Sequence, residues 1–302
     1  MVEAYLIDAT VLASLYSLMC IGLTLTYMTT KVPNFAYGSQ ITLGSYVSFS
    51  ITTFLRGDPY TSAPVAFILG GIVSVAVYLL VLRPMISRNS SLVSLMIATL
   101  AVDIFFVGIF GIFSDYLTRA FRITNSKLFI LSNNDFSFLG QRGILLTAPL
   151  LLAAIAIVVH LVLTRTKFGI AMRATVENPK LAAISGVNVQ LVYLVSWFLA
   201  GGLGSLAGSL LVLRLTGSPD IGSKLIVIIF AGSVIGGFSN VYGAILGGAI
   251  VGGSQIAITL LLAQVVGDWI TAYSLGVPLI MMVVTLVLAP QGLTSLKLRG
   301  RS

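Results

Sequence analysis

The sequence predicts an all-α fold, a polytopic membrane helix bundle of eight or nine transmembrane helices. Only 9% of its 302 residues are charged, whereas about 25% are charged in a soluble domain. The mean hydropathy is +1.05. Long apolar stretches recur from residue 9 to residue 290 without a polar interval of domain length. A soluble fold would have too little polar surface, so a single transmembrane domain covering residues 1–302 is expected.

The apolar stretches locate the expected helices. A bilayer core of about 30 Å requires about 20 apolar residues per helix. Stretches of about that length predict spans at 9–30, 34–55, 61–82, 91–114, 143–164, 191–213, 225–238, 241–265 and 271–290. The seventh is short, because Lys224 precedes it and Ser239-Asn240 follows it. It is either a full span or a re-entrant half-helix enclosed by protein, which leaves the count at eight or nine.

The charges between the spans predict a direction. Basic residues collect on the cytoplasmic side of membrane proteins, and Lys297, Arg299 and Arg301 follow the last span. With nine spans, the same side receives Lys31, Arg83, Arg88, Arg165, Lys167, Arg173 and Lys180, with Glu177 as its one acid. The other side receives the acids Glu3, Asp8, Asp58, Asp115, Asp135, Asp220 and Asp268. It also keeps the basic residues Arg56, Arg119, Arg122, Lys127, Arg142, Arg214 and Lys224, most of them in the longer segment 115–142, where the rule is weaker. We therefore expect the N-terminus outside and the C-terminus in the cytoplasm. The net charge of +8 then reflects orientation, and no nucleic-acid partner is expected.

Isolated reactive residues are expected to be structural. The chain begins Met1-Val2-Glu3 and lacks the positive segment of a cleavable signal peptide, so the first span is expected to be retained. Cys20, the single cysteine, is read as a small packing residue. His160, the single histidine, has no cysteine or acid at ligand spacing. We therefore predict no metal site.

The predicted inner face has one long loop, residues 164–190. Asn178 is a good N-cap, Pro179 suits the first helical position, and Gly186 suits a left-handed residue after the last turn. These signals predict a helix over Lys180–Ser185, which is too short to be stable alone in water. The loop is either a connector at the headgroup level or a docking helix for a cytoplasmic motor subunit.

Four polar residues are candidates for a translocation path. Asp103 is an acid in the middle of a span, where a charge costs about 2.5 to 3.5 kcal/mol on insertion scales. It either lines the path and meets a substrate ammonium group, or is protonated and hydrogen-bonded between helices. Asn34, Tyr37 and Gln40 lie at the start of the second span, where Asn34 and Tyr37 would share a helix face. They either line a polar path or join helices.

Six motifs, in order along the chain, resemble those of one transporter family. They are Gly22-Leu23-Thr24-Leu25-Thr26-Tyr27 in the first span, Asn34-Phe35-Ala36-Tyr37-Gly38 in the second, Arg83-Pro84 with 95–100, Gly169-Ile170-Ala171-Met172-Arg173-Ala174 with Glu177-Asn178-Pro179, Ala182-Ala183 and Gly186-Val187-Asn188, then 243–248, and finally Pro290-Gln291-Gly292-Leu293. The chain resembles the permease subunits of branched-chain amino acid ABC importers, specifically the shorter of the two permease kinds.

The resemblance implies a non-enzymatic transport subunit in the cytoplasmic membrane of a prokaryote. It implies two cytoplasmic ATPase subunits, a second permease that is a different chain, an extracytoplasmic solute-binding protein and contact with membrane lipid. The implied ATPase-docking residues in loop 164–190 are Gly169, Arg173, Ala174, Glu177, Asn178, Pro179, Ala182, Ala183 and Gly186. The chain has no Gly-x-x-x-x-Gly-Lys-Ser/Thr loop, so we expect it to bind no cofactor and its partners to use ATP and Mg.

The sequence does not identify a single substrate. Tyr37 stands where the family usually has His, and Asp103 stands where a small or neutral residue is expected. Branched-chain or other apolar amino acids fit the resemblance, and related scaffolds carry urea or short amides. An ion-coupled secondary transporter is the competing class, although it would normally have several buried acids. An intramembrane hydrolase has little support, because no Gly-x-Ser-x-Gly arrangement is present.

Overall fold

The computed structural model describes residues 2–123, 125–138, 140–289 and 292. Its α helices are α1 (Val2–Thr30), α2 (Tyr37–Phe54), α3 (Ser62–Val77), α4 (Arg83–Ser87), α5 (Leu92–Phe121), α6 (Ile144–Arg165), α7 (Lys167–Glu177), α8 (Pro179–Ile184), α9 (Val189–Leu211), α10 (Ile221–Gly236), α11 (Val241–Val266) and α12 (Gly276–Leu288). A π-helical segment, Tyr78–Leu82, joins α3 to α4. Short 3₁₀ helices cover Pro59–Thr61, Ser132–Asn134 and Asp268–Tyr273. The fold is an all-α membrane bundle with one small hairpin.

That hairpin consists of two short strands in the predicted loop between the fourth and fifth spans. Strands β1 (Ser137–Phe138) and β2 (Gln141–Arg142) pair antiparallel, with Ser137 opposite Arg142. The same loop is shorter than predicted, because α5 continues to Phe121 instead of ending near residue 114. Arg122 follows in the left-handed conformation, with φ of 56°. The added turns carry Asp115 and Arg119 on the helix itself.

The predicted spans correspond to helices in the described residues. Six helical segments there are long and apolar enough to cross a membrane: Ile7–Thr30, Pro59–Ser87, Leu92–Phe121, Ile144–Arg165, Val189–Leu211 and Val241–Val265. α10 and α12 are apolar but shorter, with 16 and 13 residues. The predicted stretch 225–238 is thus part of one continuous helix that begins earlier, at Ile221. At 1.5 Å per residue, α10 is about 24 Å long.

The start of the second span differs from the prediction. Asn34 lies in a turn before α2, and the backbone N–H of Tyr37 donates to the Asn34 carbonyl at 3.4 Å. Lys31 ends α1 in the left-handed conformation, with φ of 57°, and Pro33 lies in the connecting segment. Because Asn34 is not helical, the helix-face relation predicted between it and Tyr37 is wrong.

The core of the bundle is built from α1, α2, α9 and α10, around which α3 and α11 pack. Helices approach closely where glycines meet. A Cβ atom added to Gly222 of α10 would collide with the Gly38 carbonyl oxygen of α2, and one added to Gly208 of α9 would collide with the Ile41 carbonyl. The absence of a side chain at Gly222 and Gly208 therefore allows these helices to approach closely.

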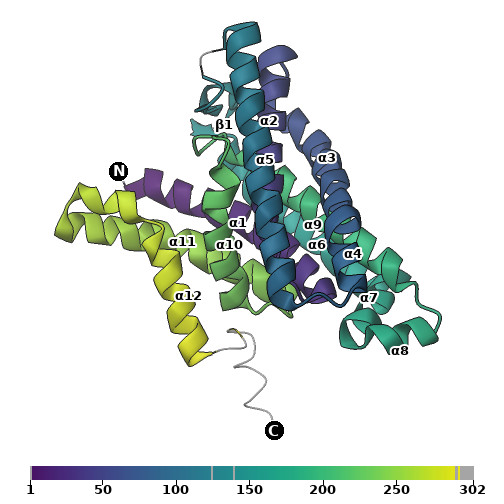
Figure 1. Cartoon of the computed structure of the whole chain (residues 1–302). Helices are drawn as coiled ribbons and strands as arrows, with labels where there is room; N and C mark the ends of the chain where they lie inside the picture. The colour runs from purple at the N-terminus through teal and green to yellow at the C-terminus, as the bar shows by residue number, and fades with distance from the viewer. Residues whose placement is uncertain (1, 124, 139, 290–291, 293–302) are drawn as a thin grey trace.

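The connecting segments gather at two ends of the bundle, seen in Figure 1 with α8 at the bottom and β1 near the top. The α8 end comprises residues 31–36, 83–91, 166–188 and 237–240. Arg83 Nη2 donates there to Gln190 Oε1 at 3.0 Å, and His160 Nδ1 lies 2.8 Å from the Tyr242 hydroxyl. The hairpin end comprises residues 55–61, 125–138 and 212–220.

Contacts between distant segments also define the hairpin end. The backbones of Phe129 and Gly217 exchange hydrogen bonds of 3.1 and 2.7 Å. Asp8, near the start of α1, forms an ion pair with Arg214. Of the residues used in the sequence predictions, Pro290, Gln291, Leu293, Lys297, Arg299 and Arg301 lie outside the described residues.

Candidate functional site

The α7–α8 segment projects from the bundle at the α8 end, as Figure 1 shows. Asn178 Oδ1 accepts the Leu181 N–H at 3.1 Å, and Pro179 occupies the first turn of α8. Gly186 follows with φ of 85°, a conformation that favours glycine. The predicted short helix is therefore confirmed, with bounds that differ by one residue from Lys180–Ser185.

The helix before α8 was missed by the sequence reading. α7 starts at a Thr166 cap, whose Oγ1 accepts the Gly169 N–H at 3.2 Å. Gly169 packs so tightly that an added Cβ would collide with the Leu163 carbonyl of α6. The Arg173 guanidinium donates to that same carbonyl. The Thr-x-x-Gly spacing was the available signal, since threonine is a common N-cap.

α8 exposes apolar side chains although it lies outside the candidate spans. Leu181 and Ile184 are 60% and 84% exposed, while Ala182 is buried against the bundle. Ile170 of α7 is also exposed. The other predicted docking residues are distributed accordingly: Gly169 is buried, Ala174 is half-buried, and Arg173, Glu177, Asn178, Pro179, Ala183 and Gly186 are exposed. Large exposed apolar groups on a two-turn helix are typical of a surface that another protein covers.

Asp103 lies at a junction of three helices. Its Oδ1 accepts a hydrogen bond from Ser39 of α2 at 2.5 Å, and its Oδ2 accepts one from Ser223 of α10 at 2.6 Å. We call these three residues the Asp103 cluster. Asp103 is 8% exposed and Ser39 is 2% exposed. Both carboxylate oxygens are therefore paired, which offsets part of the cost of burying the acid.

The other path candidates lie deeper inside the bundle. The Tyr37 hydroxyl donates to the Met19 carbonyl of α1 at 2.9 Å, so Tyr37 connects two core helices. Asn34 and Gln40 are 0% and 1% exposed, and neither amide has a hydrogen-bond partner among the described residues. The structure does not place these three residues in the Asp103 cluster. Ser39 and Ser223 belong to it instead, and nothing in their sequence spacing indicated this.

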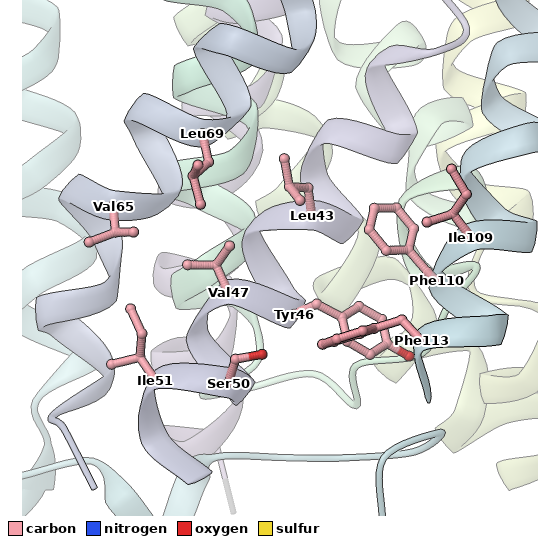
Figure 2. Close-up of a pocket in the computed structure, with 10 residues that line it drawn as sticks. All are labelled: Leu43, Tyr46, Val47, Ser50, Ile51, Val65, Leu69, Ile109, Phe110 and Phe113. Atoms are coloured by element: carbon pink, nitrogen blue, oxygen red, sulfur yellow. The ribbon is translucent and has the colours of Figure 1, made fainter. Parts of the chain in front are cut away.

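An apolar cleft lies between α2, α3 and α5, towards the hairpin end. Figure 2 shows its lining side chains, which include Leu43, Val47, Leu69, Ile109 and Phe110. Its volume is about 450 Å³. Phe110, which lines the cleft, follows Asp103 by seven residues, close to two full turns, so it lies on nearly the same face of α5 about 10 Å along the helix. One face of α5 thus carries an acid and an apolar cleft in succession.

The aromatic ring of Tyr46 closes one side of this cleft. Tyr46 stacks on Phe110 with ring centroids 5.6 Å apart, and its hydroxyl donates to the Ser126 carbonyl at 3.2 Å. The hydroxyl therefore points to the loop beyond α5, and the aromatic face borders the cleft. The lining is almost entirely hydrocarbon, with the Ser50 hydroxyl as a polar exception.

Two titratable side chains elsewhere in the described residues, His160 and Asp220, have polar partners. His160 faces Tyr242, and no group of three or more His, Cys, Asp or Glu residues that could hold a metal is found among the described residues. Asp220 accepts hydrogen bonds from Ser218 and Lys224. Burial would raise the pKa of Asp220, but these hydrogen bonds more than offset it and lower the pKa from its ordinary value.

Comparison with known proteins agrees with this architecture. The profile of the family described as branched-chain amino acid transport system / permease component matches residues 5–286. The chain is 42% identical over 286 residues to the probable branched-chain amino acid transport permease protein LivH of Methanocaldococcus jannaschii, covering 95% of this chain and 90% of that protein. It is 26% identical over 294 residues to the high-affinity LivH permease of Salmonella typhimurium, covering 93% and 92%.

A solved structure has a similar fold. PsaBC from Streptococcus pneumoniae, in complex with Fab, gives a TM-score of 0.52 at 12% identity, over 98% of this chain and 95% of that chain. At this identity the likeness concerns the fold alone. The family profile and the LivH relatives both span nearly the whole described bundle. The chain is therefore a member of the branched-chain amino acid transport permease family, a multi-pass membrane protein.

Proposed function

We propose that this chain is the transmembrane permease subunit of an ABC importer for branched-chain or other apolar amino acids, driven by ATP hydrolysis in partner subunits. The observation that carries the proposal is α8, a capped two-turn helix outside the candidate spans that exposes Leu181 and Ile184. A helix of this length is not stable by itself in water. We infer that the chain holds α8 rigid at its surface so that α8 can contact a partner protein.

The proposed orientation puts the α8 end in the cytoplasm. Seven basic residues lie at or next to this end, namely Lys31, Arg83, Arg88, Arg165, Lys167, Arg173 and Lys180, with one acid, Glu177. The hairpin end has the acids Asp8, Asp58, Asp115, Asp135 and Asp220, together with basic residues such as Arg56, Lys127, Arg142 and Arg214. Positive charge marks the inner side. Nine crossings then follow if α2, α10 and α12 traverse the bundle together with the six longer segments, with the whole chain forming one transmembrane domain.

In this proposal the docking partner is a cytoplasmic ATPase. Leu181 and Ile184 insert into its surface, and Ala182 and Asn178 hold α8 in place. Arg173 acts as a positioning residue, because its guanidinium binds the Leu163 carbonyl and fixes α7 to the end of α6. Movement of the ATPase would thus be transmitted through α7 and α8 to α6 and α9, because the connections between these helices are short. ATP and Mg would be bound by the two ATPase subunits and not by this chain.

The proposed translocation path runs along α5. The Asp103 carboxylate offers a negative group for a substrate ammonium, and the neighbouring cleft of about 450 Å³ offers an apolar surface for a branched side chain. A second permease, a different chain, would close the path from the other side, since α5 exposes many large apolar residues. Asn34, Tyr37 and Gln40 would support this path from within the core. A solute-binding protein would deliver substrate at the hairpin end.

The test is ATP-dependent uptake of radiolabelled leucine into vesicles that contain the chain and its co-purified partners. We expect Ile184→Asp to reduce both co-purification of the ATPases and uptake by about thirtyfold, as for an interface hot spot of about 2 kcal/mol. The matched control is Lys180→Gln, which changes an exposed residue of α8 that is not among the implied docking residues. Uptake that continues without ATP, or that follows an ion gradient, would overturn the proposal.

A further inference from the structure

A second groove lies between α3, α6 and α9, away from the Asp103 cluster. We call it the α6 groove. Its volume is about 780 Å³. Leu203, Leu206 and Leu210 of α9 line it although they are only 3%, 8% and 2% exposed, so they form its floor. Phe67 of α3 and Ala154 of α6 lie on the walls. These residues belong to helices long and apolar enough to cross the membrane.

The dimensions of the α6 groove match one membrane leaflet. On α6 the lining runs from Thr147 to Val159, and on α9 from Leu199 to Leu210. At 1.5 Å per residue, each edge is about 17 to 18 Å long. The hydrocarbon core is about 30 Å thick, so one leaflet contributes about 15 Å. The groove therefore extends from the hairpin end to near the middle of the bilayer.

A transmembrane helix does not fit these dimensions. Such a helix is about 30 Å long and about 10 to 12 Å wide with its side chains, so it would extend well beyond the ends of this groove of about 18 Å. A partner helix would also cross both leaflets, whereas the groove stops after one. An acyl chain is thinner and ends within one leaflet.

The hairpin end of the α6 groove is polar. The Tyr60 hydroxyl lies 3.4 Å from Thr147 Oγ1 and donates to Asp135 Oδ1 at 2.7 Å. Arg142 lies two residues before α6, is exposed, and forms no ion pair with a described residue. At the same end the Asp135 carboxylate accepts hydrogen bonds from the Tyr60 hydroxyl and the Ile144 N–H, so groups of both charges are available to a phospholipid headgroup. The apolar groove and its polar end together match an amphiphile.

We propose that the α6 groove binds one acyl chain of a phospholipid from the leaflet at the hairpin end, with the phosphate near Arg142 and Thr147. The occupied groove would fill the space between α6 and α9 that the protein's own side chains leave open. Because α6 leads directly into α7, a bound lipid would set the position of the α7–α8 segment relative to the bundle. The inference does not depend on which solute is carried.

The experiment uses the full chain in membranes that contain a phosphatidylglycerol probe with a photoreactive diazirine in its acyl chain. After illumination, labelled residues are mapped by mass spectrometry. We expect Leu203 and Leu206 to be labelled about as strongly as the exposed Ile157, because only a chain inside the groove reaches the floor. Labelling confined to exposed residues such as Ile157, or a cross-link of the floor to another protein, would overturn the proposal.

Variants test the site independently. Ala154→Trp should fill the wall of the groove, exclude about two methylene groups, and reduce labelling of Leu206 about tenfold. Ile157→Trp, on α6 but outside the groove, should leave it unchanged. If Ala154→Trp does not fold, Arg142→Gln is the variant that decides the test. It should reduce labelling of Leu206 by the phosphatidylglycerol probe about fivefold. It should affect a phosphatidylcholine probe similarly, because this lipid carries the same phosphate. Equal labelling of Leu206 in all variants would contradict the proposal.

Discussion

The α7–α8 segment and the Asp103 cluster satisfy their polar groups in opposite ways. In the α7–α8 segment the bonds are local: Thr166 caps Gly169, and Asn178 caps Leu181, each three residues away. In the Asp103 cluster the partners Ser39 and Ser223 are 64 and 120 residues away. The first arrangement makes a small rigid body at the surface, and the second joins three helices in the membrane. Mutations should therefore damage the segment locally and the cluster globally.

The largest effect is expected where α2 and α10 meet beside the Asp103 cluster. Gly222→Ala puts a methyl group onto the Gly38 carbonyl, and the two helices cannot separate without breaking the Ser223–Asp103 bond. We expect a loss of about 3 kcal/mol in the free energy of unfolding. Denaturant titration in detergent measures it. Gly253→Ala is the control, because its added Cβ meets nothing within 4 Å; equal losses in both variants would contradict the packing argument.

A smaller but still global effect is expected at Asp103. Asp103→Ala removes the carboxylate that accepts from Ser39 and Ser223. Ser39 keeps the Asp103 backbone carbonyl as an acceptor at 3.3 Å, whereas Ser223 loses its partner, at a cost of about 2 kcal/mol. Asp103→Asn retains an acceptor and should cost less. Thermal unfolding compares the two. If Asp103 also contacts the substrate, Asp103→Asn should raise the KM for leucine uptake while the amount of folded protein stays constant. An unchanged KM would show that Asp103 contributes only to helix packing.

The same contrast explains what the sequence could and could not predict. The caps of α8 and its terminal Gly186 are local signals, so the helix could be placed to within a residue. Apolar length also located the helices, of which six in the described residues are long and apolar enough to cross a membrane. Ser39 and Ser223 could not be identified as partners of Asp103, because only the packing of α2, α5 and α10 brings them together. Asn34 was misplaced because the helix period was extended across the turn after Pro33.

At the surface, Asn178→Ala should act locally. Loss of the cap costs about 1 kcal/mol of helix stability, and this should accelerate hydrogen exchange in residues 179–185 without changing global unfolding. Asn178→Asp retains the cap oxygen and serves as the control. Faster exchange in α2 or α10 after Asn178→Ala would show that the α7–α8 segment is not an independent unit.

The smallest effect is expected at the hydrogen bond from Arg83 to Gln190, which joins α4 to the first turn of α9 at 3.0 Å. Both side chains are exposed there, so Gln190→Ala should change stability by less than about 0.5 kcal/mol. If the α7–α8 segment depends on its own local bonds, leucine uptake should remain within about twofold of the unaltered chain, because an exposed hydrogen bond contributes little. A large loss of uptake at full stability would show that movement of α8 reaches the membrane through Arg83 and α4. Uptake and thermal unfolding of Gln190→Ala, compared with those of Gln190→Glu, distinguish the two routes, since glutamate can still accept from Arg83.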